Sequence, residues 1–193
     1  MHLLTRPEIE ALLAAPGRTT WLGRRDHPLL VLAAQTGLRV SELIGLDRDA
    51  IHLGTGAHVR RVGRSRKERC TPLARYARRA ALQDWLNEPA RRGTSTLFPT
   101  VHGARLSADS IQALLAKHMS VAVKNCTSLA SKRVTPHVLR HSAAMELLQA
   151  DVDSSVISLW LGHESIETTQ TYLHAPLELK GKRGLTTPLM AQP

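Results

Sequence analysis

The chain has 193 residues, 42% of them hydrophobic, which is enough to form one folded domain with at most a small appendage. Its longest apolar run, residues 28–34, is too short to cross a membrane, and the charged N-terminus argues against a signal peptide. Two cysteines exclude a disulfide framework and favour a reducing cytoplasm. The net charge of +10 favours a polyanionic partner such as nucleic acid, although a solvated basic surface would give the same value.

The first part of the chain predicts helices followed by a small sheet. Thr5 and Glu8 form a capping box before apolar residues at helical spacing, and residues 26–35 predict a buried helix that Gly37 ends. Another short helix is expected over residues 40–46. Three strands joined by two turns are then expected, with the strands over residues 49–53, 57–63 and 68–73 and the turns at 54–56 and 64–67.

The rest of the chain predicts helices with clear start and stop signals. Thr135 is a good N-cap and Pro136 suits the first helical position, so a helix is expected to about residue 149. Asp153 predicts the start of another helix, which Gly162 ends, and Ser165 predicts the start of a third. The remaining expected elements are helices over 73–87 and from 107 to about 123, and loops over 89–96 and 125–133. The expected fold class is therefore mostly α with one small three-stranded antiparallel β-sheet.

The highest concentration of charge lies in residues 58–79, where Glu68 is the single acid among nine basic residues. The basic residues are Arg60, Arg61, Arg64, Arg66, Lys67, Arg69, Arg75, Arg78 and Arg79. A basic turn between two strands is well shaped to reach a DNA groove or the phosphate backbone. A solvated charged hairpin is the alternative, but the repulsion among so many like charges favours a bound polyanion.

Two groups suited to phosphate chemistry lie on the helix after Thr135. His137 and Arg140 are three residues apart in its first turn, where backbone N–H groups favour an anion. This pair alone is weak evidence, because the pattern is common by chance. His137 and His141 are four apart and could in principle bind a metal, but no glutamate stands between them and no third ligand is evident. A metal site is therefore not expected.

Three segments, taken in order, resemble the signature boxes of the tyrosine recombinases, the phage integrase and Xer-type family. They are residues 36–43 (TGLRVSEL), 135–142 (TPHVLRHS) and 161–172 (LGHESIETTQTY). A hairpin ending in KERCTPL at 67–73 adds to the match, and the resemblance runs from about residue 4 to about residue 180. Any one box is weak evidence, whereas all three in order indicate the family fold and a site-specific DNA strand-exchange activity.

The resemblance implies metal-independent transesterification through a covalent tyrosine intermediate. Tyr172 would attack a DNA phosphodiester and give a 3′-phosphotyrosyl link with a free 5′-hydroxyl. Arg39 and Arg140 would hold the non-bridging oxygens and stabilise the charge of the transition state in place of a metal ion. No cofactor is expected, and no ATP is needed because the phosphate ester is conserved rather than hydrolysed.

The resemblance also gives His137 a role in proton transfer and His163 a hydrogen bond to the phosphate, with Glu42 orienting the site. Family hairpins carry a lysine that protonates the departing 5′-oxygen, but the first such position here is Arg64. Arginine is a poor general acid, so Lys67 is expected to serve instead. The expected DNA-binding residues are Arg60, Arg61, Arg64, Arg66 and Arg69.

The implied partner is double-stranded DNA, with free monomers assembling as a tetramer on synapsed DNA at the bacterial nucleoid and without a membrane. Residues 1–180 are expected to form the catalytic domain and residues 181–193 a C-terminal tail, and the N-terminal core-binding domain of the family is expected to be absent. The reaction would serve integration, excision, resolution or transposition. Two alternatives stay open: a DNA-binding protein that keeps the fold but has impaired catalysis, and a type IB topoisomerase-like relaxation activity.

Overall fold

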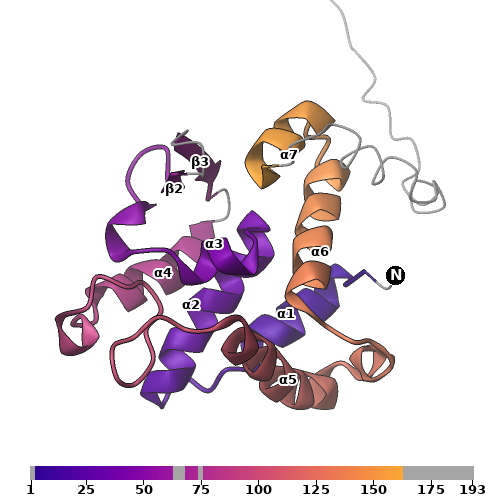
Figure 1. The fold of residues 1–193 in the computed structure, drawn as a ribbon. Helices are drawn as coiled ribbons and strands as arrows, with labels where there is room; N and C mark the ends of the chain where they lie inside the picture. The colour runs from indigo at the N-terminus through magenta and orange to yellow at the C-terminus, as the bar shows by residue number, and fades with distance from the viewer. Residues whose placement is uncertain (1–2, 63–67, 74–75, 163–193) are drawn as a thin grey trace, which may run out of the picture.

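The computed structural model describes residues 3–62, 68–73 and 76–162, and the structural statements below concern these residues (Figure 1). The α-helices are α1 (Arg6–Ala14), α2 (Trp21–Thr36), α3 (Val40–Ile44), α4 (Tyr76–Asn87), α5 (Ala108–Asn125), α6 (Pro136–Gln149) and α7 (Ser154–Leu161). The strands are β1 (Ile51–His52), β2 (His58–Val62) and β3 (Glu68–Pro72), and three short 3₁₀ helices are η1 (Arg48–Ala50), η2 (Arg91–Gly93) and η3 (Thr127–Ser131). The expected fold class is confirmed. The helix expected after Ser165 lies outside the described residues.

Local capping signals fix where several helices begin. The side chains of Ser107, Thr135 and Asp153 accept hydrogen bonds from backbone N–H groups in the first turns of α5, α6 and α7, as their positions predict. The expected start of α2 at residue 26 is wrong by five residues. The Thr20 hydroxyl accepts the N–H of Gly23 at 3.1 Å, and this cap starts the helix one turn and a half earlier.

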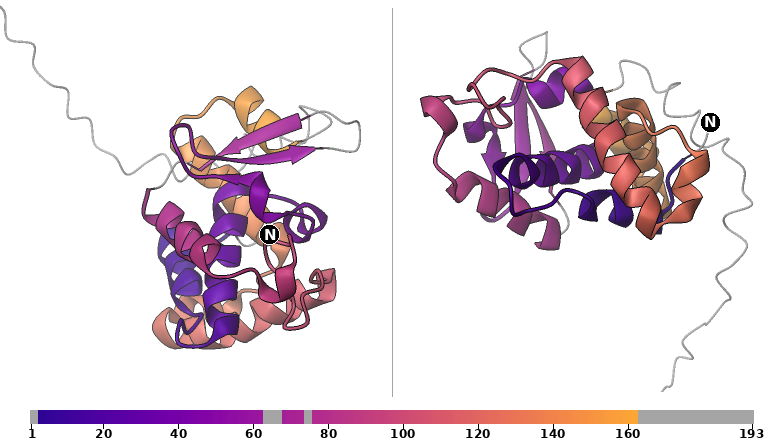
Figure 2. Two further views of the ribbon diagram at one scale, coloured as in Figure 1. Left: turned by 90° about the vertical axis from the view of Figure 1, so that its left-hand side faces the viewer. Right: turned by 90° about the horizontal axis from the view of Figure 1, so that it is seen from below.

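The sheet is antiparallel in the order β1–β2–β3, as the three predicted strands require. Ile51 pairs with Val59, which in turn pairs with Thr71, and both valine and threonine are buried. The observed strands are shorter than expected, and β1 begins later than residue 49 because that residue belongs to η1. Two views agree that the sheet and α7 lie side by side at one end of the helical body (Figures 1 and 2).

The segment 125–133, expected to be a polar loop, instead contains η3. Its order comes from Glu8, whose buried carboxylate accepts a hydrogen bond from Ser128 Oγ and another from Lys132 Nζ, each at 2.7 Å. Leu129 is buried between these two contacts. The loop over 89–96 likewise contains a 3₁₀ turn, η2. The polar composition of 125–133 predicted a loop, but a carboxylate from α1 contacts the segment and η3 forms within it.

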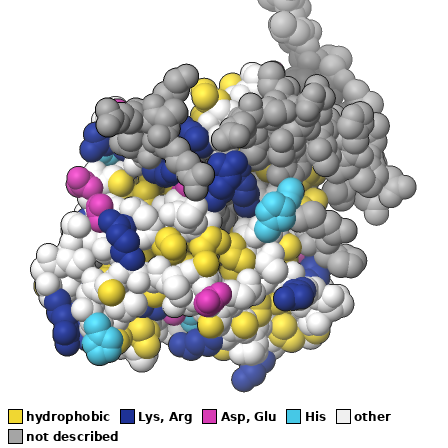
Figure 3. Space-filling model, in the orientation of Figure 1, with side chains coloured by type: hydrophobic (Ala, Val, Ile, Leu, Met, Phe, Trp, Pro, Cys, Tyr) yellow, Lys and Arg dark blue, Asp and Glu magenta, His cyan; other side chains and the backbone are white. Residues whose placement is uncertain are grey.

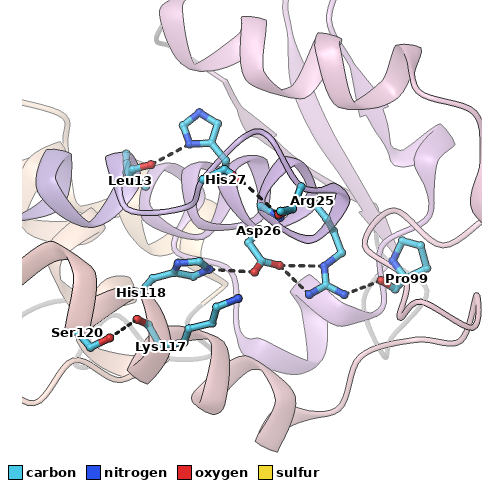
Figure 4. A network of polar contacts seen from close by, with 11 residues as sticks. Leu13, Arg25, Asp26, His27, Pro99, Lys117, His118 and Ser120 are labelled. Carbon is cyan, nitrogen blue, oxygen red and sulfur yellow. Dashed lines mark hydrogen bonds and ion pairs between the residues drawn. The ribbon is translucent and has the colours of Figure 1, made fainter.

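A buried polar network lies within the helical body (Figure 4). Asp26 on α2 accepts hydrogen bonds from Arg25 Nε and Nη2 at 2.9 and 2.7 Å, and it lies 2.9 Å from His118 Nε2 on α5. Arg25 Nη1 donates to the carbonyl of Pro99 at 2.9 Å. Burial opposes ionisation of Asp26, but His118 and Arg25 outweigh it and lower the pKa of this carboxyl. The network joins α2, α5 and the segment before α5.

The main apolar core surrounds α2, which packs against α1, α4 and α6. Leu29, Leu30 and Leu32 on α2 are each at most 1% exposed. A second, smaller cluster joins α6 to α7 through Ala144, Ile157 and Leu161. Among the helices that the structure describes, none combines the length and apolarity needed to cross a membrane.

Candidate active site

The first predicted box forms the junction between α2 and α3. Gly37 ends α2 with φ at +60°, a conformation that favours glycine, and Arg39 is the N-cap of α3 in extended backbone. A Cβ at position 37 would lie 2.6 Å from Leu161 Cδ2, so the glycine also permits close approach of α7. The Arg39 side chain is 47% exposed and therefore accessible to a ligand.

Glu42 connects this junction to the sheet. Its carboxylate accepts the backbone N–H of Arg39 at 2.8 Å, and it forms ion pairs with the Arg39 side chain at 3.7 Å and with Arg61 on β2. The Glu42 side chain is only 6% exposed, so both arginines approach a largely desolvated carboxylate. Glu42 thus contacts Arg39 of the first box and Arg61 of the sheet, and the contact with Arg61 is one that the sequence pattern does not predict.

Arg140 lies at the meeting point of all three boxes. It is buried on α6, and its Nη1 donates to the carbonyl of Gly37 at 2.6 Å while its Nη2 donates to the carbonyl of Leu161 at 2.8 Å. Gly37 stands two residues before Arg39, and Leu161 stands two residues before His163 in the sequence. One guanidinium therefore fixes the backbone of the first and third boxes relative to the second.

The two histidines of α6 contact one another. His137 is exposed and His141 is partly buried, and their Nε2 atoms lie 2.7 Å apart. Their rings meet edge to face with centroids 4.2 Å apart. Burial, with the nearby His137 and Arg140, lowers the pKa of His141 to about 4. From the sequence alone, His141 was considered only as a metal ligand. The i, i+4 spacing of His137 and His141 is the signal that predicts this contact.

The hairpin arginines have different surroundings. Arg60 on β2 is 44% exposed and lies 3.5 Å from Glu68, whereas Arg61 faces Glu42. The Arg69 guanidinium packs against Gly162, because a Cβ at Gly162 would lie 1.5 Å from Arg69 Nη1. Arg69 therefore brings β3 to the C-terminal end of α7. The Thr71 hydroxyl adds a contact there, 3.4 Å from the carbonyl of Trp160.

Five of the predicted site residues lie outside the described residues: Arg64, Arg66, Lys67, His163 and Tyr172. The segments that lead to them meet at the same end of the molecule, because β2, β3 and α7 are neighbours there. Lys and Arg side chains gather over this region between the sheet and α7, with histidine beside them (Figure 3). Within the described ranges, no group of three His, Cys, Asp or Glu side chains is placed to hold a metal ion.

Comparison with known proteins shows which family shares this arrangement. The model of the phage integrase family matches residues 2–178. A Sinorhizobium fredii protein classed with the integrases and recombinases is 57% identical over 180 residues, covering 93% of this chain and 54% of that protein. Tyrosine recombinase XerD of Pseudomonas aeruginosa is 35% identical over 176 residues, covering 89% of this chain and 56% of its own length. This chain therefore spans about half the length of the curated relatives it matches.

Solved structures have the same fold. The crystal structure of XerA recombinase superposes with a TM-score of 0.75 at 28% identity, covering 92% of this chain and 62% of that one. XerH site-specific recombinase, solved bound to its difH substrate before cleavage, gives a TM-score of 0.77 at 24% identity, covering 91% and 51%. With the family model matching nearly the whole sequence and the three boxes meeting around Arg140, the chain belongs to the phage integrase family of tyrosine recombinases.

Proposed function

We propose that this chain supplies the catalytic domain of a site-specific DNA recombinase. The observation that carries the proposal is the position of Arg140, which binds the backbone just before Arg39 and just before Gly162 and His163. Three segments far apart in the sequence are thereby held at one end of the molecule, beside the basic hairpin. A cluster of cations of this kind suits the transfer of a phosphodiester.

In the proposed reaction, the Tyr172 hydroxyl oxygen attacks the phosphorus of a DNA phosphodiester. The new bond joins the tyrosine oxygen to the 3′-phosphate, the bond from phosphorus to the 5′-oxygen breaks, and that oxygen takes up a proton. Arg39 and Arg140 balance the charge that develops on the non-bridging oxygens, because a guanidinium binds phosphate oxygens through charge-assisted hydrogen bonds. His163 would donate a further hydrogen bond to the phosphate.

Proton transfer in this proposal involves His137 on the tyrosine side and Lys67 on the leaving-group side. His137 is exposed at the start of α6, where a substrate phosphate has access to it. Lys67 lies three residues after Arg64 in the sequence. In the hairpin segment 63–67, it is the residue whose side chain has an amine that can exchange a proton near neutral pH.

DNA would lie across the end of the molecule that carries the sheet and α7. Among the hairpin arginines that the structure describes, Arg60 is the most exposed and can reach a phosphate, and Arg64 and Arg66 would extend the contact along the backbone. Arg61 and Arg69 would support the site mainly through Glu42 and Gly162, which they contact. Residues 1–180 form the catalytic domain in this proposal, acting in a tetramer on synapsed bacterial DNA.

The test is covalent capture on a nicked suicide duplex cut from the DNA that flanks the gene, with chelator present. An SDS-resistant protein–DNA adduct is expected for the wild type and lost in Tyr172→Phe. Tyr76→Phe is the matched control, because the chain has only two tyrosines. DNA binding without an adduct in the wild type would contradict the proposed cleavage, and an adduct in Tyr172→Phe would contradict the nucleophile.

A further inference from the structure

The contact between the two histidines of α6 restricts where their protons can be. The Nε2 atoms of His137 and His141 are 2.7 Å apart, within hydrogen-bond distance, and the rings meet at 88°. Only one hydrogen fits between two nitrogens at this distance, so one ring donates and the other accepts. If the Nε2 atom of one imidazole accepts, the Nε2 atom of the other must carry the hydrogen, so the two tautomers depend on each other.

The surroundings favour His141 as the acceptor. Burial, His137 and Arg140 together hold the pKa of His141 near 4, so this ring is neutral at pH 7. Helices α2, α5 and α7 pack against α6, and His137 and Arg140 are the charged groups that lower the pKa of His141. His137 is the exposed member of the pair and the one that a substrate can reach.

We infer that His141 is a positioning residue for His137: it accepts the hydrogen of His137 Nε2 and thereby leaves His137 Nδ1 as the nitrogen that exchanges protons in the reaction. This inference rests on the proposed function, because it assigns an atom to the proton transfer that His137 performs there. When the proton of the attacking tyrosine hydroxyl moves to Nδ1, the imidazolium still donates from Nε2 to His141. His141 thus orients the ring and stabilises its charged form.

The first test observes the hydrogen directly and needs no activity. Long-range ¹H–¹⁵N spectra of ¹⁵N-histidine-labelled protein, with His137 assigned from a His137→Gln sample, report which ring nitrogen is protonated. The expected result is a hydrogen on Nε2 of His137 at pH 7, and a mixture of both tautomers in His141→Leu. A hydrogen on Nδ1 in the wild type, or an unchanged tautomer in His141→Leu, would overturn the inference.

The second test uses the rate of covalent adduct formation on the suicide duplex across pH 5.5 to 9. His141→Leu and His141→Asn are expected to lose roughly tenfold in rate, since each leaves the position of imidazole Nε2 without an acceptor. His141→Gln restores most of that rate, because its amide oxygen reaches the position of imidazole Nε2 whereas the asparagine amide is one methylene shorter. Gln149→Leu, at an exposed position of the same helix, is the control for loss of a polar side chain.

The pH profile separates positioning from a purely structural effect. Loss of the acceptor destabilises the charged ring of His137, so the acid limb of the rate profile shifts to lower pH in His141→Leu and returns in His141→Gln. Equal loss in the leucine and glutamine variants, with unshifted profiles, would overturn the inference. If the wild type forms no adduct but shows the predicted tautomer, the hydrogen bond between the two histidines is confirmed. The proposed function is then contradicted, and so is the role of that hydrogen bond in catalysis.

Discussion

Replacing Arg140 by alanine removes two charge-assisted hydrogen bonds from the place where the three boxes meet. Each bond from a buried guanidinium to a carbonyl contributes about 1.5 to 3 kcal/mol to stability. Water can enter the space left by the side chain and solvate the two carbonyls, so we expect the lower end of the summed range, about 3 kcal/mol. With a urea dependence of about 2 kcal/mol per molar, the unfolding midpoint falls by roughly 1.5 M.

The assay is equilibrium urea unfolding followed by circular dichroism, with Arg140→Lys and Arg39→Ala beside Arg140→Ala. An ammonium can bond one of the two carbonyls, so Arg140→Lys should lose about half as much stability. Arg39 is 47% exposed, and its alanine variant should change stability by only about 0.5 kcal/mol. Both alanine variants should lose cleavage by roughly two to three orders of magnitude. A wild-type midpoint for Arg140→Ala would refute the reasoning that this residue joins the boxes.

Three further predictions concern two supports of the site, Glu42 and Gly37, and one buried carboxylate of the fold, Glu8. Glu42→Gln removes the charge that both its arginine partners face, so cleavage should fall roughly tenfold in the adduct assay while DNA binding strengthens or stays equal. Gly37→Ala should lower stability by about 2 kcal/mol in urea unfolding, because the residue has φ at +60° and a Cβ would press on Leu161; an unchanged midpoint would contradict this. Burial opposes ionisation of Glu8, but its hydrogen-bond donors lower its pKa from 4.5 to about 2. Since the folded-state pKa is depressed, Glu8 contributes about 3 kcal/mol above pH 4.5 that is lost as the pH falls toward 2. The stability gap between wild type and Glu8→Gln should therefore begin to narrow near pH 5 and close only near pH 2.

Helix caps could be predicted from the sequence, whereas contacts between distant residues could not. Thr135, Asp153 and Gly162 mark helix ends correctly because a cap depends on a few neighbouring residues, and these are visible in the sequence. Thr20 carries the same local signal, and its cap starts α2 five residues before the predicted position. The three boxes and the order of the strands could also be predicted from the sequence, since each is a local pattern.

The sequence by itself therefore determined the helix ends, the three strands and the identity of the residues in the boxes. Only the tertiary structure decided how these residues meet. The bond from Arg140 to Gly37 spans 103 positions, and Glu8 reaches Lys132 across 124. No spacing rule covers such sequence separations, because the first contact depends on how α2, α6 and α7 pack and the second on how α1 packs beside η3. That packing lets Arg140 bond to the backbone of two other boxes and places Arg69 against Gly162. Composition alone showed only that Arg140 and Arg69 are basic.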